Sequence, residues 1–213
     1  MYAERADQIC ERGVVAILRG VDPESAIDVA TAVVEGGVTA LEVTADTPKI
    51  TETIDTLSDQ FDDVLVGAGT VLDAETARAV QLAGAEFLVT PSVDDGVIET
   101  ANRYGTPVAT GAFTPTEAVR AYEAGADFVK VFPAATGGPD HVAALGGPLP
   151  QIPLIPTGGV GPSNAGEYIE VGAAAVGVGS AIVDGDAVAN EDYEVITENA
   201  RRTVNAVAAA RNR

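Results

Sequence analysis

A chain of 213 residues is long enough for one domain with a substantial core or for one closed α/β barrel. Its 12 basic and 32 acidic residues give a net charge of −20, which argues against nucleic acid and anionic membranes as partners. Apolar residues make up 46% of the chain, yet no apolar run approaches the roughly 18 residues that a membrane span needs.

The chain begins with a charged segment, residues 1–7, which lacks the apolar run of a secretory signal, so a cytoplasmic protein is expected. Cys10 is the single cysteine; no intrachain disulfide can form, and a small buried thiol is expected. Lysine occurs only at Lys49 and Lys130. Many acidic residues with so little lysine predict a surface adapted to high salt (a halophilic protein), where screening removes most self-repulsion.

One pattern recurs along the chain: a helix is expected to end at a glycine, and a short apolar strand follows almost at once. The segment Glu123-Ala124-Gly125-Ala126-Asp127-Phe128-Val129 is an example. The glycines that carry the pattern are Gly37, Gly84, Gly125 and Gly172, with a weaker fifth case at Gly105.

Eight strands are predicted in alternation with helices, at residues 14–18, 40–44, 64–67, 87–89, 107–110, 128–132, 154–156 and 174–178. Helices are predicted at residues 25–35, 74–83, 116–124 and 191–211, with start signals such as Asp73 and Thr114-Pro115. Eight such units in one domain, residues 1–213, predict an α/β fold, a single (β/α)₈ TIM barrel. A doubly wound open sheet is the alternative, although no Gly-x-Gly-x-x-Gly follows the first strand.

Glycine-rich turns follow the last two predicted strands, at the end of a barrel where active sites are built. These are Thr157-Gly158-Gly159 after the seventh strand and Gly179-Ser180 after the eighth. Glycines there let backbone N–H groups approach an anion, so the pair of turns predicts a phosphate site. The alternative is that both are tight turns without a ligand.

Two charged residues interrupt apolar strands. Lys130 lies within predicted strand 128–132, and Glu42 within strand 40–44. Because side chains alternate along a strand, both could point into the barrel. Three interpretations remain open: a lysine at a solvated edge, a buried structural ion pair, or an amine nucleophile with a carboxylate that carries protons.

The sequence offers little for metal or triad chemistry. His141 is the single histidine and Cys10 lies near the amino terminus, so neither a zinc cluster nor a histidine-based triad can be assembled. A carboxylate site for Mg²⁺ stays open. His141 is expected to be a solvated or capping residue.

Five motifs occur in one order over nearly the whole chain: Ile17-Leu18-Arg19, Leu41-Glu42-Val43-Thr44, Val66-Gly67-Ala68-Gly69-Thr70-Val71, Phe128-Val129-Lys130-Val131-Phe132-Pro133-Ala134 and Pro156-Thr157-Gly158-Gly159-Val160. Together they resemble the bacterial-type 2-keto-3-deoxy-6-phosphogluconate (KDPG) aldolase and 4-hydroxy-2-oxoglutarate aldolase family. The resemblance implies a (β/α)₈ barrel, usually a homotrimer, and a class I (Schiff-base) mechanism without metal or cofactor. The implied reaction cleaves KDPG to pyruvate and glyceraldehyde 3-phosphate, as in the Entner–Doudoroff pathway.

The resemblance also implies roles for residues. Lys130 matches the Schiff-base lysine and Glu42 the general acid/base. The implied substrate-binding residues are Arg19 and Thr70 near the pyruvate carboxylate, Pro91 and Phe132 in the pocket wall, and Thr157, Gly158, Gly159, Gly179 and Ser180 in the turns that would hold phosphate.

Asp46 departs from the family pattern, which has an arginine two positions after Leu-Glu-Val-Thr. An acid cannot attract the substrate carboxylate, so this contact is expected to shift to Arg19 or Lys49, or the substrate preference differs. The related 2-keto-3-deoxy-6-phosphogalactonate aldolase also lacks that arginine and is an alternative. From other classes, a sugar-phosphate isomerase or epimerase without covalent catalysis and a metabolite-binding barrel stay open.

Overall fold

The computed structural model describes residues 2–213; Met1, where the predicted domain starts, lies outside the described residues. Parallel strands form one sheet: β1 (Val14–Leu18), β2 (Ala40–Thr44), β3 (Leu65–Gly69), β4 (Leu88–Val89), β5 (Val108–Ala112), β6 (Phe128–Val131), β7 (Leu154–Pro156) and β8 (Val176–Val178). The predicted strands are all confirmed, with ends within two residues of those expected.

The order of strands in the sheet is β7-β6-β5-β4-β3-β2-β1-β8. Its two edges meet through a bridge between Thr157 and Gly177, and the Ala174 N–H donates to the Leu154 carbonyl oxygen at 2.9 Å. The sheet is therefore a nearly closed barrel. This confirms the predicted (β/α)₈ barrel and shows that the open doubly wound sheet is wrong.

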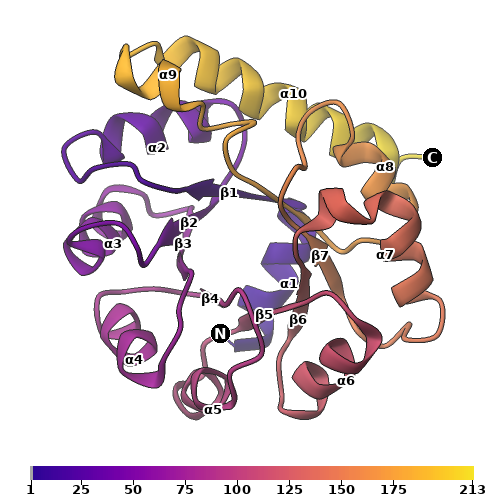
Figure 1. Ribbon diagram of the computed structural model, residues 1–213. Helices are drawn as coiled ribbons and strands as arrows, with labels where there is room; N and C mark the ends of the chain where they lie inside the picture. The colour runs from indigo at the N-terminus through magenta and orange to yellow at the C-terminus, as the bar shows by residue number, and fades with distance from the viewer. Residues whose placement is uncertain (1) are drawn as a thin grey trace.

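Helices surround the barrel and alternate with its strands (Figure 1). Their bounds are α1 (Tyr2–Arg12), α2 (Ala26–Glu35), α3 (Ile50–Gln60), α4 (Ala74–Leu82), α5 (Asp95–Tyr104), α6 (Pro115–Glu123), α7 (Gly138–Gly146), α8 (Ala165–Glu170), α9 (Gly185–Ala189) and α10 (Tyr193–Arg211), with a 3₁₀ turn η1 (Ala134–Thr136). The predicted start signals are confirmed, because Asp73 accepts from the Thr76 N–H at 2.6 Å and Thr114 forms a capping box with Glu117.

The repeated glycines end helices as expected. Gly37, Gly84, Gly105, Gly125 and Gly172 all have left-handed backbones, with φ between 70° and 102°. The next residue then donates back across the last helical turn; the Ala85 N–H donates to the Val80 carbonyl oxygen at 2.9 Å. These compact helix ends lead directly into the strands and leave the longer loops for the opposite, carboxyl end of the barrel.

Side chains alternate between the barrel interior and the helix layer. In β2, Leu41 and Val43 pack in the outer cluster between sheet and helices, and in β6 Val129 and Val131 do the same. The interior cluster contains Val15, Ala40, Leu65, Phe87, Val89, Ala109, Phe128, Ile155 and Ala175. Glu42 and Lys130 therefore point into the barrel, as the alternation predicted.

Helix α1 was not predicted, and it covers the amino-terminal end of the barrel. Ile9 is buried in the interior cluster, with Ala6 and Cys10 packed beside it. The Arg211 guanidinium ties α1 to the end of α10, because it donates to the carbonyl oxygens of Cys10 and Glu11.

Cys10 is half-buried rather than buried, which corrects the expectation for this residue. Burial, assisted by the charge of Asp7, raises the pKa of its thiol.

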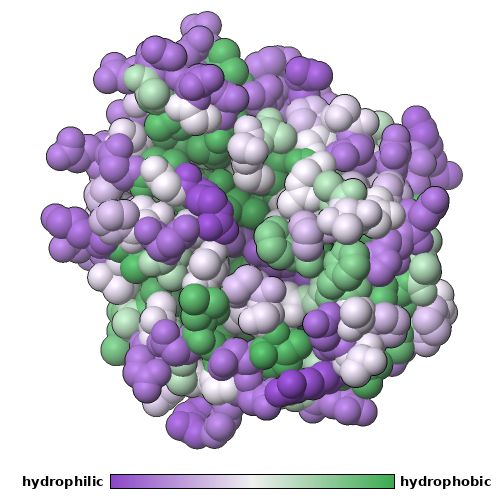
Figure 2. Space-filling model, in the orientation of Figure 1, coloured by the Kyte–Doolittle hydropathy of each residue, from purple (hydrophilic) through white to green (hydrophobic). Residues whose placement is uncertain are grey.

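Hydrophilic side chains predominate at the periphery of the face seen in Figure 2, and hydrophobic ones gather nearer its centre. Among the helices within residues 2–213, none combines the length and the apolar character that crossing a bilayer requires. Because acidic residues outnumber basic ones, 32 to 12, ion pairs such as Arg19–Asp46 and Arg201–Glu198 leave the net charge of −20 to solvent and counter-ions.

We expect the Tm to rise when KCl is increased from dilute buffer to multimolar concentration, because counter-ions screen the repulsion within this acidic chain. Each 1 kcal/mol of repulsion removed raises the Tm by about 2–4 °C in a domain of this size. Thermal denaturation followed by circular dichroism measures the effect. A Tm that is already maximal in dilute buffer would show that the predicted adaptation to high salt is wrong.

Candidate active site

A pocket of about 710 Å³ opens among the loops that follow the strands. Lys130 lines it, and so do all the residues expected to bind substrate: Arg19, Thr70, Pro91, Phe132, Thr157, Gly158, Gly159, Gly179 and Ser180. A second cavity of about 20 Å³, lined by both Glu42 and Lys130, lies within the barrel and has room for about one water molecule. The structure thus brings Lys130 and all the predicted substrate-binding residues together at one pocket, and places Glu42 beside Lys130 in the adjoining interior cavity.

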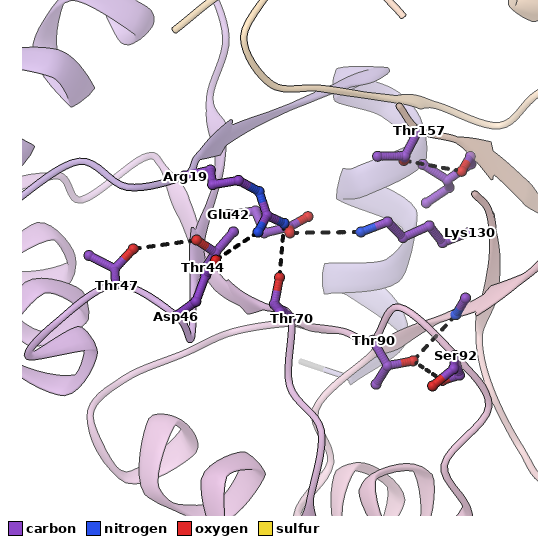
Figure 3. A network of polar contacts seen from close by, with 12 residues as sticks. Arg19, Glu42, Thr44, Asp46, Thr47, Thr70, Thr90, Ser92, Lys130 and Thr157 are labelled. Carbon is purple, nitrogen blue, oxygen red and sulfur yellow. Dashed lines mark hydrogen bonds and ion pairs between the residues drawn. The ribbon is translucent and has the colours of Figure 1, made fainter. Parts of the chain in front are cut away.

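Lys130 and Glu42 point toward one another across the barrel (Figure 3). The Lys130 Nζ lies 4.0 Å from the Glu42 Oε1, and the two side chains are 5% and 3% exposed. Lys130 also lies over the ring of Phe132, with 5.3 Å between Nζ and the ring centroid. Because β6 lies between β5 and β7 and its lysine is buried, the interpretation of Lys130 as a solvated edge residue is wrong.

The Glu42 carboxyl holds a proton more tightly than an ordinary glutamate. Burial raises its pKa, and the charges of Lys130 and Arg19 oppose that effect only in part. Within residues 2–213, its Oε1 has no hydrogen-bond partner. A buried carboxyl with a raised pKa and an uncommitted oxygen is suited to accept and return protons, whereas a purely structural glutamate would have its hydrogen bonds satisfied.

Arg19 lies at the rim of the pocket, above Glu42 in Figure 3. Its Nη1 donates to the Asp46 Oδ2 at 2.8 Å and its Nη2 donates to the Thr70 Oγ1 at 3.0 Å. Lys49 instead forms an exposed ion pair with Glu52 at 3.2 Å and is absent from the pocket lining. Of the two cations expected to replace the missing arginine, Arg19 is the one that the structure places at the site.

Thr70 has a left-handed backbone, with φ of 56°, which is unusual for a β-branched residue. Such strained residues cluster at functional sites, where the surrounding structure holds them in place. Its hydroxyl is thereby aimed at Arg19.

The glycine turns after β7 and β8 form another part of the pocket wall, and the second turn lies next to β1 because β8 pairs with β1. Gly158 and Gly159 have φ of 90° and 78°, and a Cβ at Gly159 would collide with the side chain of Ala135. Among the described lining residues, the cationic side chains are Arg19 and Lys130, so the donors at these turns are backbone N–H groups and hydroxyls such as that of Ser180. Such a cradle can hold a phosphate without a cationic side chain beside it.

Comparison with known proteins decides which family this barrel represents. Residues 6–199 match a family model described as KDPG and KHG aldolase. The chain belongs to this family of aldolases. Its members are lyases, and the resemblance read from the five motifs is therefore confirmed.

Named relatives cover most of the chain. A 2-dehydro-3-deoxy-6-phosphogalactonate aldolase of Escherichia coli (strain K12) is 39% identical over 78% of this chain and 82% of its own. A 2-dehydro-3-deoxy-phosphogluconate aldolase of Pseudoalteromonas atlantica is 34% identical over 93% of each. A crystal structure of KDPG aldolase from Legionella pneumophila, with pyruvate captured at low pH as a covalent carbinolamine intermediate, is 31% identical with a TM-score of 0.86, covering 93% of this chain and 97% of that chain.

Glycines in β3 of this aldolase make room for the side chain of Glu42. Gly67 and Gly69 face the interior, where a Cβ at Gly67 would collide with the ring of Phe87 and one at Gly69 with the carboxylate of Glu42. The Gly-Ala-Gly-Thr motif was noted in the sequence, but the reason for its second glycine becomes visible only in the fold.

We expect Gly69→Ala to lower aldolase turnover by about 10²-fold, because a carboxylate displaced by about 1 Å loses its alignment with substrate. Gly146→Ala in α7 is the matched control, since its Cβ would meet only Leu154 Cδ1 at an ordinary 3.7 Å. Steady-state turnover and thermal denaturation of both variants measure the effect. Unchanged turnover in Gly69→Ala would show that the position of Glu42 does not depend on this glycine.

Several lining residues were not anticipated: Ile17, Val160, Gly161, Pro162, Ser163, Ala181, Val183 and Gly185. Gly161, Pro162 and Ser163 follow the seventh strand, and this place in the chain was a signal for the same rim. His141 is only partly solvated and caps no helix among the described residues, which corrects the expectation. It is half-buried, stacks on Phe113 at 4.5 Å, and its Nε2 lies 2.8 Å from the Phe113 carbonyl oxygen.

Proposed function

We propose that this protein is a class I aldolase that cleaves KDPG to pyruvate and D-glyceraldehyde 3-phosphate through a Schiff base on Lys130. The observation that carries the proposal is the buried Lys130 amine, which lies at the wall of the pocket and 4.0 Å from a Glu42 Oε1 that accepts no hydrogen bond within residues 2–213. The relative with a captured pyruvate carbinolamine supports the same chemistry. The proposed site residues are those gathered at the pocket, with Lys130 and Glu42 as the catalytic pair.

The reaction begins when the Lys130 Nζ, as the free amine, attacks the C2 ketone of the substrate. The resulting carbinolamine loses water and leaves an iminium between Nζ and C2. Glu42 lies close enough to carry the protons that this dehydration requires, directly or through one water in the adjoining cavity.

Carbon–carbon cleavage follows. Glu42 takes the proton of the C4 hydroxyl, the C3–C4 bond breaks, and its electrons move onto the iminium to give an enamine. Glyceraldehyde 3-phosphate leaves. Protonation of the enamine at C3 and attack of water at C2 then release pyruvate and restore the amine. The raised pKa of Glu42 suits both the cleavage step and the later protonation of the enamine, because the same carboxyl must accept a proton and return it.

The two ends of the substrate are anionic and would bind at different parts of the pocket wall. We place the phosphate at the glycine turns, Gly158-Gly159 and Gly179-Ser180, which line the pocket and can offer backbone N–H donors. The carboxylate would lie at Arg19 and Thr70, the cationic side of the rim. With a chain charge of −20, these local donors supply the attraction that the overall field does not.

A second substrate is favoured by a specific observation. A relative named 2-dehydro-3-deoxy-6-phosphogalactonate aldolase shares 39% identity with this chain, and Asp46 replaces the arginine typical of the phosphogluconate enzymes. The two acids differ in configuration at C4. Measuring kcat/KM for both epimers decides between them, and a higher value for the galactonate epimer would show that the primary assignment is wrong.

A non-covalent isomerase or epimerase and a metabolite-binding barrel would leave Lys130 without a covalent role. Neither would yield a reduced adduct with pyruvate, so one trapping experiment separates them from the proposed aldolase. The homotrimer implied by the family resemblance belongs to the proposal as well, and light scattering of the purified protein tests it.

A further inference from the structure

The loops after three successive strands meet at one side of the pocket. Arg19 follows β1, Asp46 follows β2 and Thr70 follows β3. One guanidinium joins them, with 2.8 Å from Nη1 to the Asp46 Oδ2 and 3.0 Å from Nη2 to the Thr70 Oγ1 (Figure 3). Two of the five N–H donors of Arg19 are thus fixed from two directions; within residues 2–213 the others have no hydrogen-bond partner, and Arg19 lines the pocket.

The turn that carries Asp46 is itself held firmly. The Ala45 N–H donates to the Gly69 carbonyl oxygen at 2.7 Å, and the Thr47 N–H donates to the Thr44 carbonyl oxygen at 2.9 Å. The Thr44 hydroxyl is the main group that lowers the pKa of the Asp46 carboxyl, followed by the opposing effect of burial and then by Arg19. Asp46 is therefore an ionised acceptor on a fixed backbone at neutral pH.

Asp46 does not reach the substrate space. Arg19 and Thr70 line the pocket, whereas Asp46 is absent from its lining. The ion pair lies at the rim with both side chains about half exposed, at 53% and 51%. An exposed pair of this kind contributes little to stability, so its value to the protein lies in the orientation of Arg19.

We propose that Asp46 is a positioning residue: it holds the guanidinium of Arg19 against Thr70 so that the free N–H groups bind the carboxylate of the keto acid. This inference rests on the proposed function. It gives the residue that departs from the family pattern a definite task, because the carboxylate contact moves to Arg19 and Asp46 fixes the replacement in place. A long flexible arginine without this anchor would sample many rotamers at the rim.

Whether Asp46→Asn strengthens or weakens substrate binding distinguishes a positioning role of Asp46 from a purely electrostatic one. If Asp46 acted only through its negative charge, Asp46→Asn would strengthen the binding of an anionic substrate, because a repulsive charge is removed. If Asp46 positions Arg19, the same substitution weakens binding, because the charge-assisted hydrogen bond to the guanidinium is lost.

The experiment uses pyruvate and borohydride. The pyruvate concentration that gives half-maximal trapping is measured for the wild-type protein, Asp46→Asn, Arg19→Ala and the double variant, together with inhibition of cleavage by inorganic phosphate. Glu198→Gln is the matched control. Glu198 pairs with Arg201 on α10 at 2.8 Å with similar exposure, and it lies outside the pocket lining.

We expect Asp46→Asn to raise the half-saturating pyruvate concentration by about tenfold, the scale of one hydrogen bond to a charged group. Inhibition by phosphate stays unchanged, and Asp46→Asn adds no further loss to Arg19→Ala. Glu198→Gln behaves like the wild-type protein. This non-additivity is what a residue that acts through Arg19 must show.

Tighter or unchanged pyruvate binding in Asp46→Asn would overturn the positioning role while the proposed function stands. Additive losses in the double variant, or a change confined to phosphate inhibition, would overturn it too. A wild-type protein that forms no adduct with pyruvate would overturn the proposed function, and the role of Asp46 with it.

Discussion

Borohydride reduction in the presence of pyruvate will add the mass of one reduced pyruvyl group to the protein, and peptide mapping will place it on Lys130. The reason is geometric. Lys130 is the lysine that lines the pocket, whereas Lys49 lies on the surface in an ion pair with Glu52. Reduction converts the iminium to a stable secondary amine, so the adduct marks the nucleophile directly.

Lys130→Met will form no adduct and will lose turnover by on the order of 10⁴-fold or more, because removing the nucleophile of a covalent mechanism removes the whole route. Lys49→Met, which also deletes one ammonium group, is the matched control and keeps both adduct and turnover. An adduct on Lys49, or trapping that survives Lys130→Met, would show that the Schiff-base assignment is wrong.

The Lys130→Met variant should still fold, although breaking a buried pair by removing one partner is often costly. The charge of Lys130 is the largest influence that lowers the pKa of Glu42, and without it only the charge of Arg19 opposes the effect of burial. The neutral form of the carboxyl is then favoured further, which reduces the uncompensated charge in the interior. Far-ultraviolet circular dichroism, measured alongside activity, checks that the Lys130→Met variant is folded.

The sequence was sufficient for most of the barrel because the same local signals recur in every unit. Left-handed glycines such as Gly84 and Gly125 end helices, and short apolar runs continue directly as strands. Alternation along a strand also placed Glu42 and Lys130 on the interior face. These are local properties, and they need no knowledge of the rest of the chain.

Other features depend on where distant segments meet. Helix α1 escaped prediction because Ile9 and its neighbours form a narrow apolar face within a highly charged segment, and only the open end of the barrel gives that face a partner. The contact between Arg19 and Asp46 depends on the meeting of loops from neighbouring strands. Asp46 stood out in the sequence as a departure, but its partner could be identified only from the fold.

Glu42→Gln will keep the fold and lower turnover by at least about 10²-fold, the usual contribution of a positioned general acid or base. Glutamine preserves the shape of the side chain and cannot accept the proton of the C4 hydroxyl. In this variant turnover should fall while borohydride trapping is kept, because the amine of Lys130 remains and proton transfer is lost. An unimpaired Glu42→Gln variant would return the pair to the interpretation of a structural ion pair.

The same variant tests the raised pKa of Glu42 through stability. The unfolded chain releases this proton near the ordinary value of 4.5, whereas the folded chain keeps it to higher pH. Between these two values the folded state binds more protons, so the contribution of Glu42 to stability falls as the pH rises through that window. Glutamine has no such proton. The stability of Glu42→Gln relative to the wild-type protein should therefore increase as the pH rises from 4.5 and level off above the folded pKa.

Urea unfolding at a series of pH values measures that difference, and subtracting one protein from the other removes the shared pH dependence of other carboxyls such as Asp73 and Glu117. A constant difference would mean that the folded and unfolded pKa of Glu42 are equal. A rising difference together with lost turnover would identify Glu42 as a residue that costs the fold stability at neutral pH and is kept for its chemistry.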